Sequence, residues 1–235
     1  MLSPLAILLA GSLMLPIADP AQVKGCSARK PFKTEIQIDL DIPETRYDFS
    51  MTRKNLTEGQ VELTTAWKSE HEDHVWASSD LSVEGLARGG MGVMSASQFI
   101  GVPYDKYGMY YCPYVKKLIV SVHYNTKIFV AREHKKGTCD FSATLAHEEQ
   151  HHQINVDTVS EVMMRLEKDL PEIISYMERR YVPRAEVENG AMNLQAGLED
   201  ALKIYSEHMF KEMSKRNAVL DSPEEYQRVA AQCPR

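Results

Sequence analysis

The chain has 235 residues, 43% of them hydrophobic, and a formal net charge of −6 at pH 7. This length suits one sizeable domain or two small ones, and the apolar content is enough for a hydrophobic core. No basic patch stands out in this acidic chain, so nucleic acid is not an expected partner.

The most apolar segment of the chain is at the N-terminus, from residue 2 to residue 17. It has the length of a signal-peptide hydrophobic region and is short for a transmembrane helix, which needs about 20 residues. We therefore expect residues 1–25 to be a signal peptide or an N-terminal apolar segment. Residues 26–235 are then a single exported domain with no stable membrane span after cleavage. The oligomeric state is not indicated.

The chain has an even number of cysteines, which predicts disulfide bonds in an exported protein: Cys26, Cys112, Cys139 and Cys233. Three pairings are possible. Cys112 and Cys139 bracket a predicted hairpin, so we expect these two to lie near each other and to pair. Cys26 would then pair with Cys233 and tie the two ends of the chain together. The alternative is four free, buried thiols, as in a cytosolic protein.

Strand signals occur in two segments. Residues 33–42 alternate between apolar side chains and polar or charged ones, as expected of a half-buried strand. Residues 115–132 are rich in β-branched side chains, and Asn125 and Thr126 can form a turn within them. This second segment therefore predicts a β-hairpin.

Two further segments before residue 100 predict loops. Residues 69–80 contain His71 and His74 with acidic residues between them, but this spacing is poor for a metal site on a helix, so we expect a solvated loop. Residues 85–92 are rich in glycine. They lack the Lys-Ser/Thr of a phosphate-binding loop, so we expect a flexible connection.

The second half of the chain predicts helices. Apolar residues at helical spacing indicate a helix from about residue 140 to 169, which Pro171 kinks or ends, and a second stretch to about 181. A long helix is expected from 184 to about 216, and Ser222 and Pro223 begin a short final one. The predicted fold class is α+β, a small antiparallel sheet or hairpin followed by a long helix and a helical C-terminal half.

The first of these helices contains the pentapeptide His147-Glu-Glu-Gln-His151, which has the pattern H-E-x-x-H. Residues four apart on a helix share a face, so His147 and His151 can offer two imidazoles to one metal ion. Tetrahedral zinc takes nitrogen ligands at about 2.0–2.1 Å, which this spacing satisfies without backbone strain. Glu148 lies beside the first ligand and can act as a general base on metal-bound water. The alternative interpretation of the motif is a charged, solvated helix face.

A catalytic zinc ion takes three protein ligands and one water molecule, so the motif needs a third donor. If helices 140–170 and 184–216 form an antiparallel hairpin that turns near residue 176, residue 151 lies level with about residue 201. Near that level, His208 lies within about 60° of the apolar face of its helix. We therefore predict His208 as the third ligand, with Glu207 as the second candidate.

The residues His147, Glu148 and His151 resemble the motif of the zincins, the broad class of zinc metallopeptidases. The chain also resembles, more loosely, small exported bacterial proteins that are predicted to be zinc-dependent proteases. The shared features are a strand pair, a cysteine shortly before the motif (here Cys139) and a helical C-terminal half, over roughly residues 110–233. This resemblance implies a periplasmic or secreted zinc metallopeptidase that hydrolyses peptide or protein substrates.

Two functions remain open on these observations. In the first, the chain is an exported zinc peptidase in which Glu148 activates water and the hairpin at 115–132 presents an edge strand to an extended peptide. In the second, it is a non-catalytic cell-envelope protein, with or without a bound metal, whose helical half contacts a partner. Glu148 distinguishes the two, because a purely structural metal site has no use for that carboxylate.

Overall fold

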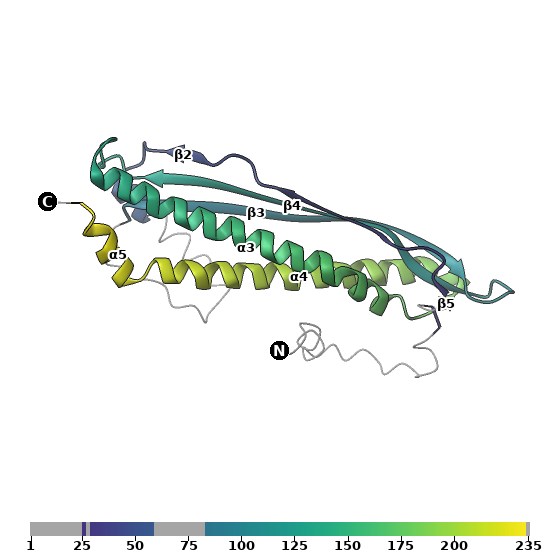
Figure 1. Ribbon diagram of the computed structural model, residues 1–235. Coiled ribbons are helices and arrows are strands. Elements are labelled where there is room, and N and C mark those ends of the chain that lie inside the picture. Colours follow the sequence, from purple (N-terminus) through teal and green to yellow (C-terminus); the bar gives the residue numbers. More distant parts are fainter. Residues whose placement is uncertain (1–24, 27–28, 59–82, 234–235) are drawn as a thin grey trace. The chain divides into compact units, whose positions relative to one another are not determined.

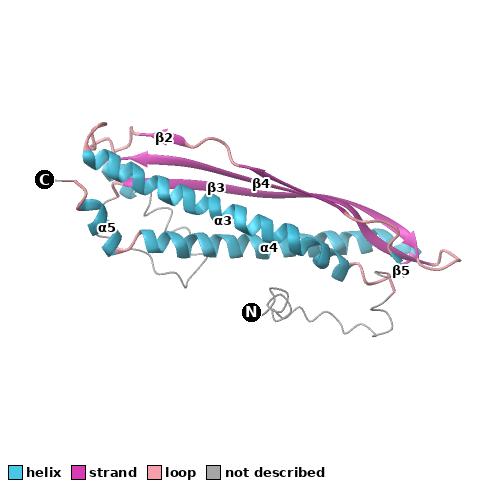
Figure 2. Cartoon of the chain, viewed as in Figure 1, coloured by secondary structure: helices cyan, strands magenta, loops and turns pink. Residues whose placement is uncertain are grey.

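The structure is a computed structural model that describes residues 25–26, 29–58 and 83–233. The predicted signal-peptide segment and the predicted loop at 69–80 lie outside these residues. The described part combines a five-stranded sheet with helices (Figures 1 and 2), so the expected mixture of α and β structure is confirmed. No helix within these ranges is long and apolar enough to cross a membrane.

The chain divides into two compact units, each built from three segments. Unit 1 consists of Met1–Gln37, Ala96–Ile119 and Asp169–Ala201. Unit 2 consists of Ile38–Ser95, Val120–Lys168 and Leu202–Arg235, and it contains the H-E-x-x-H motif.

Strand β4 (Tyr110–Val130) is the centre of the sheet and pairs with all four other strands: β1 (Glu35–Asp41), β2 (Arg46–Asp48), β3 (Gly85–Pro103) and β5 (Val182–Pro183). β2 runs parallel to β4, whereas β5 runs antiparallel to it. The sheet is therefore mixed and larger than the small antiparallel sheet expected. β1 confirms the strand predicted at 33–42, since Ile36 and Ile38 are half-buried between exposed neighbours.

The predicted hairpin at 115–132 is wrong, because this segment is part of the single strand β4. The alternation of buried side chains continues through the supposed turn, with Tyr124, Thr126 and Ile128 all buried. Asn-Thr lacks the glycine that makes Asn-Gly a strong turn signal. The hairpin lies earlier in the chain, where residues 104–109 join β3 to β4 and Gly108 has a φ of 67°. A connection this short can join only antiparallel neighbours.

The glycine-rich segment 85–92 is the beginning of β3 and not a flexible connection. Its glycines allow neighbouring groups to approach the strand closely. A Cβ atom on Gly89, for example, would lie 2.6 Å from the hydroxyl oxygen of Tyr124 in β4. Gly85 and Gly89 therefore serve close packing rather than flexibility.

Helix α3 (Cys139–Met177) continues through Pro171, so the predicted end near residue 169 is wrong. Proline removes one backbone hydrogen bond from a helix. The apolar stripe nevertheless continues across it, because Leu170, Ile173 and Ile174 are buried. Packing on both sides of the proline thus stabilises a helix that local propensity would end.

Helices α4 and α5 agree more closely with the sequence-based prediction. A 3-10 turn (Arg184–Glu186) leads into α4 (Val187–Leu220). Earlier in the chain, residues 53–58 are also helical. The predicted apolar face of α4 is buried as expected: Leu194, Leu198, Ala201, Leu202, Tyr205 and Met209. Helix α5 (Pro223–Ala230) begins as predicted, since the side chain of Ser222 accepts a hydrogen bond from the N–H of Glu225.

Two disulfides are present, Cys26–Cys112 in unit 1 and Cys139–Cys233 in unit 2. Both predicted pairings are therefore wrong. They depended on a hairpin that would bring Cys112 and Cys139 together, whereas these residues lie near the beginning and beyond the end of the long strand β4. The two disulfides fit an oxidising, exported environment.

Candidate metal centre

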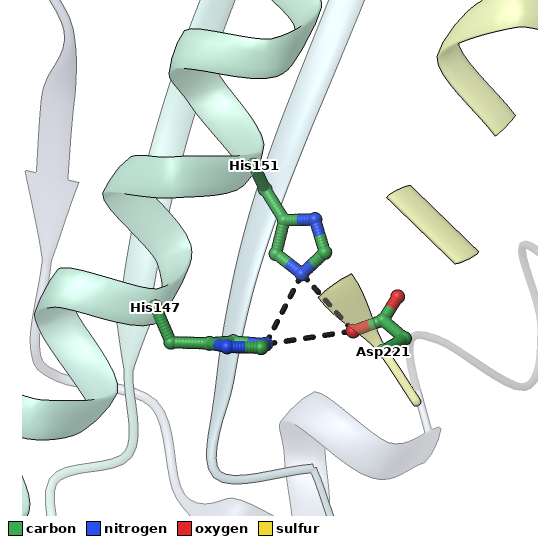
Figure 3. Close-up of side chains that lie close together, drawn as sticks. All are labelled: His147, His151 and Asp221. Carbon is green, nitrogen blue, oxygen red and sulfur yellow. Dashed lines mark hydrogen bonds and ion pairs between the residues drawn. The ribbon is translucent and has the colours of Figure 1, made fainter. Parts of the chain in front are cut away.

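His147 and His151 lie one turn apart on α3 within unit 2, and both are largely buried, with 6% and 9% of their surface exposed. Their Nε2 atoms are 3.2 Å apart (Figure 3). The two rings are nearly perpendicular, with centroids 4.8 Å apart. The i, i+4 spacing on a regular helix is sufficient to bring these two nitrogens together.

Asp221 completes a cluster of three donor atoms (Figure 3). It directly follows the last residue of α4, and its N–H donates to the carbonyl of Asn217, which continues the helical turn. Its Oδ1 atom lies 3.0 Å from Nε2 of His151 and 3.4 Å from Nε2 of His147. Burial alone would raise the pKa of Asp221, but hydrogen bonds with His147 and His151 lower it well below its usual range.

The three distances match those expected around a tetrahedral metal ion. Ligand atoms at 2.0–2.1 Å from zinc lie about 3.3 Å from one another when the angles are tetrahedral. The cluster has separations of 3.0, 3.2 and 3.4 Å between Nε2 of His147, Nε2 of His151 and Oδ1 of Asp221. Two imidazoles and one carboxylate also form a donor set found in catalytic zinc sites. These residues therefore could hold a metal ion and leave its fourth position open.

Asn217 on α4 orients the ring of His151. Its Oδ1 lies 2.8 Å from Nδ1 of His151, and its Nδ2 donates to Oδ1 of Asn155 at 2.8 Å. Because the amide nitrogen is used by Asn155, the carbonyl oxygen faces the imidazole and Nδ1 must carry the proton. Burial lowers the pKa of His151, but Asp221 outweighs this effect and raises it to about 8. Metal binding at Nε2 would then release a proton.

Tyr226 on α5 contacts two members of the cluster. Its hydroxyl donates to Oδ1 of Asp221 at 3.1 Å, and its ring centroid lies 5.5 Å from that of His147. The Nδ1 atom of His147 is buried and has no hydrogen-bond partner within the described ranges. The His147 ring is therefore oriented by the contacts of its Nε2 with Asp221 and His151 and by packing against Tyr226, and not by a hydrogen bond at Nδ1.

Glu148 lies on the neighbouring face of α3, against strand β3, and only 5% of it is exposed. The backbone N–H of Ala87 hydrogen-bonds to its carboxylate, and a Cβ on Gly85 would lie 2.6 Å from its Oε1. Burial raises the pKa of Glu148 to about 7, although the charges of His151 and His147 oppose the shift. A carboxyl with a pKa near neutrality can both accept and release a proton under physiological conditions.

The structure does not bring the predicted third ligand into this cluster. Nε2 of His208 lies 3.1 Å from the guanidinium of Arg165, which is about 21 Å further along α3 than His151. Glu207 has an oxygen 3.9 Å from Nζ of Lys203 on its own helix. Asp221 occupies the place that was expected for His208 or Glu207.

The error came from the register between the two long helices. A turn near residue 176 would place His151 level with residue 201, but α3 continues to Met177 and α4 begins only at Val187. His151 therefore lies beside Asn217, which is sixteen residues beyond the expected residue 201. The correct pairing of Cys139 with Cys233 would have indicated this, because it brings the C-terminal residues to the beginning of α3.

Comparison of the chain with protein-family models, with curated proteins and with solved structures finds no match. A function for this chain therefore has to be inferred from the residues of the cluster and from their surroundings.

Proposed function

We propose that this chain is an exported zinc-dependent metallopeptidase. In this proposal His147, His151 and Asp221 hold the zinc ion, and Glu148 is the general base. The observation that carries the proposal is the convergence of three donor atoms within 3.0–3.4 Å of one another, two of them on the helix that also bears a buried Glu148. The two disulfides support the exported location.

The proposed reaction is the attack of water on a peptide carbonyl. A bound zinc ion would polarise the carbonyl and lower the pKa of water to about 7, so that the nucleophilic hydroxide is available near neutral pH. Glu148 accepts the proton of the attacking water and delivers it to the leaving amine. Asn217 keeps the lone pair of Nε2 of His151 directed toward the cluster.

Strand β3 is the proposed binding edge for an extended substrate. Among the described strands it pairs only with β4, so its other edge has no partner strand there. The N–H of Ala87, near the beginning of β3, reaches the carboxylate of Glu148. A peptide that pairs with this part of β3 would therefore pass beside Glu148. The edge strand expected at 115–132 cannot serve, because this segment is part of β4, which pairs with all four other described strands.

A non-catalytic role is the second candidate, and one observation favours it. The hydrogen bond between Ala87 and Glu148 attaches α3 to β3, so this carboxylate also has a structural use. In that case the cluster would only bind a metal ion or cross-link α3 with the turn before α5. The two candidates differ in whether Glu148 is needed for hydrolysis.

The proposal is tested by comparing Glu148→Gln with Glu149→Gln in the full chain. Glu149 is the exposed neighbour in the same motif, so it is a matched control. We expect one zinc per chain in the wild type and both variants by elemental analysis, and loss of zinc in His147→Ala. Cleavage of a broad peptide library should disappear in Glu148→Gln and persist in Glu149→Gln. Zinc binding without any cleavage by the wild type would favour the non-catalytic role, and absence of zinc would contradict both the metal site and the peptidase.

A further inference from the structure

We propose that the Cys139–Cys233 disulfide keeps the metal centre assembled, so that reduction of this bond weakens metal binding. This inference rests on the proposed function, because it concerns the same three ligands. It adds a form of regulation: the affinity of the site for metal depends on the thiol–disulfide state of its surroundings.

The disulfide joins the two parts of unit 2 that supply the ligands. Cys139 is the first residue of α3, eight residues before His147. Cys233 lies just after α5, at the end of the segment that begins with Asp221 and contains Tyr226. The bond therefore attaches the segment that carries the third ligand to the beginning of the helix that carries the first two.

Helix α5 depends on this attachment because it has little packing of its own. None of its eight residues is buried. The ion pair between Glu225 and Arg228 and the cap formed by Ser222 are both local to this segment and do not attach it to α3. In the described part of the chain, α5 and the residues after it contact α3 through the ring of Tyr226 on His147, the disulfide, the contact of Cys139 Sγ with the carbonyl of Gln232 and the electrostatic interaction of Glu225 with His147. An eight-residue helix with no buried face is not held by the hydrophobic effect.

The two disulfides differ in their exposure to a reductant. Cys26 and Cys112 are buried, with 0% and 2% of their surface exposed, whereas Cys139 is exposed and Cys233 is half-buried. Thiol–disulfide exchange needs a thiolate to reach one of the sulfur atoms. A dithiol would therefore reduce Cys139–Cys233 first. Two electrons and two protons pass to the protein, which gains two thiols, and the dithiol becomes a cyclic disulfide.

Loss of the bond acts on the ligands through Tyr226. Once α5 separates from α3, the ring of Tyr226 no longer packs on His147, and Tyr226 moves with α5 so that its hydroxyl no longer fixes the carboxylate of Asp221 within the cluster. Asp221 itself remains at the end of α4, but its carboxylate can then rotate away. Loss of groups that orient metal ligands typically lowers metal affinity about 10–100-fold. We expect a decrease in this range.

The test compares the wild type with the Cys139→Ser/Cys233→Ser double variant in the full chain under non-reducing conditions. Zinc affinity is measured by competition with a chromophoric chelator, and we expect at least a tenfold weaker affinity in the variant. In the metal-free proteins, the amides of residues 224–230 should exchange hydrogen faster in the variant, whereas buried amides such as that of Val115 should not change. The unchanged amides show that the variant is folded.

A second measurement adds a dithiol to the wild type and to the double variant, because a dithiol also binds zinc directly. The wild type should release zinc beyond the amount lost by the variant as its first two thiols appear, before the buried disulfide reacts. Equal zinc affinity of wild type and double variant, or zinc release that does not follow the first two thiols, would overturn the inference and leave the peptidase proposal intact. If the oxidised wild type does not bind zinc, the proposed function itself fails, and the hydrogen exchange of α5 still reports whether the disulfide holds this helix.

Discussion

Nδ1 of His151 donates a hydrogen bond to Oδ1 of Asn217, although the two residues are 66 positions apart in the chain. Asn155 holds the amide of Asn217 in the orientation that makes this possible. The contact fixes the tautomer of His151 and directs its Nε2 toward Asp221 and His147. The register between α3 and α4 thus determines which ring nitrogen of His151 carries the proton, because it places Asn217 beside Nδ1.

Replacement of Asn217 by alanine should weaken zinc binding about 10–100-fold, because the tautomer and orientation of the His151 ring are no longer fixed. The measurement is the zinc dissociation constant by chelator competition. Asn193→Ala is the matched control, since Asn193 is an exposed asparagine on the same helix and should leave the constant unchanged. Equal affinity in Asn217→Ala and the wild type would show that the tautomer of His151 does not matter for binding.

Asp221→Ala and His208→Ala should differ sharply in zinc affinity. Removing Asp221 takes away a ligand, so the loss should exceed the roughly 100-fold effect of removing an outer partner. Removing His208 should leave the affinity unchanged, because its ring contacts Arg165 and not the cluster. Both constants are obtained in the same competition assay. The opposite order of the two variants would restore His208 as the third ligand.

Gly85→Ala should destabilise the protein by about 1–3 kcal/mol, as overpacking of a filled site does. The added Cβ would lie 2.6 Å from Oε1 of Glu148 and 2.8 Å from Cγ2 of Thr144, so Glu148 must move. Gly92→Ala in the same strand is the matched control, since no atom lies within 4 Å of its new Cβ. Urea unfolding measures both free energies. We also expect peptide hydrolysis to fall in Gly85→Ala alone, and equal stabilities of the two variants would contradict the close contact.

Lys30→Met should destabilise unit 1 by about 3 kcal/mol near pH 7, because it leaves Glu178 as an unpaired buried charge. The side chain of Glu178 is only 1% exposed and accepts hydrogen bonds from Lys30 and from the N–H of Val115. Lys117→Met, which breaks the exposed pair with Glu35, should cost less than about 1 kcal/mol. Urea unfolding of the two variants compares the pairs directly.

The cost of Lys30→Met should also increase with pH. Burial raises the pKa of Glu178 above its ordinary value of 4.5, and Lys30 opposes that shift, so the variant has the more strongly raised pKa. An acid with a raised pKa keeps its proton in the folded state while the unfolded chain loses it, so stability falls as pH rises through this window. Unfolding free energies should therefore converge for the variant and the wild type below about pH 4 and separate above it. A difference that is constant with pH would show that the charge of Glu178 is not the cause.

Patterns confined to a few neighbouring residues were sufficient for much of the fold and for three of the four residues of the candidate site, since only Asp221 was missed. The i, i+4 histidines, the apolar face of α4 and the cap at Ser222 all depend on helical periodicity, and each lies as expected. The alternation at β1 likewise predicted a strand. These features follow from backbone geometry within one or two turns of chain, so no distant contact is needed to establish them.

The place of Asp221 in the site and the pairing of the cysteines depend on contacts between residues 70 or more positions apart. Their positions follow from where α3 ends and which residues of α4 pack against it. Packing lets α3 continue past Pro171 and β4 continue past Asn125, although proline favours the end of a helix and asparagine favours a turn. Because α3 and β4 are longer than expected, the residues that lie opposite the motif and opposite each cysteine are many positions away from the expected ones. The third ligand could therefore be identified only once the register of the packed helices was known, because burial of apolar side chains, and not local propensity, sets that register.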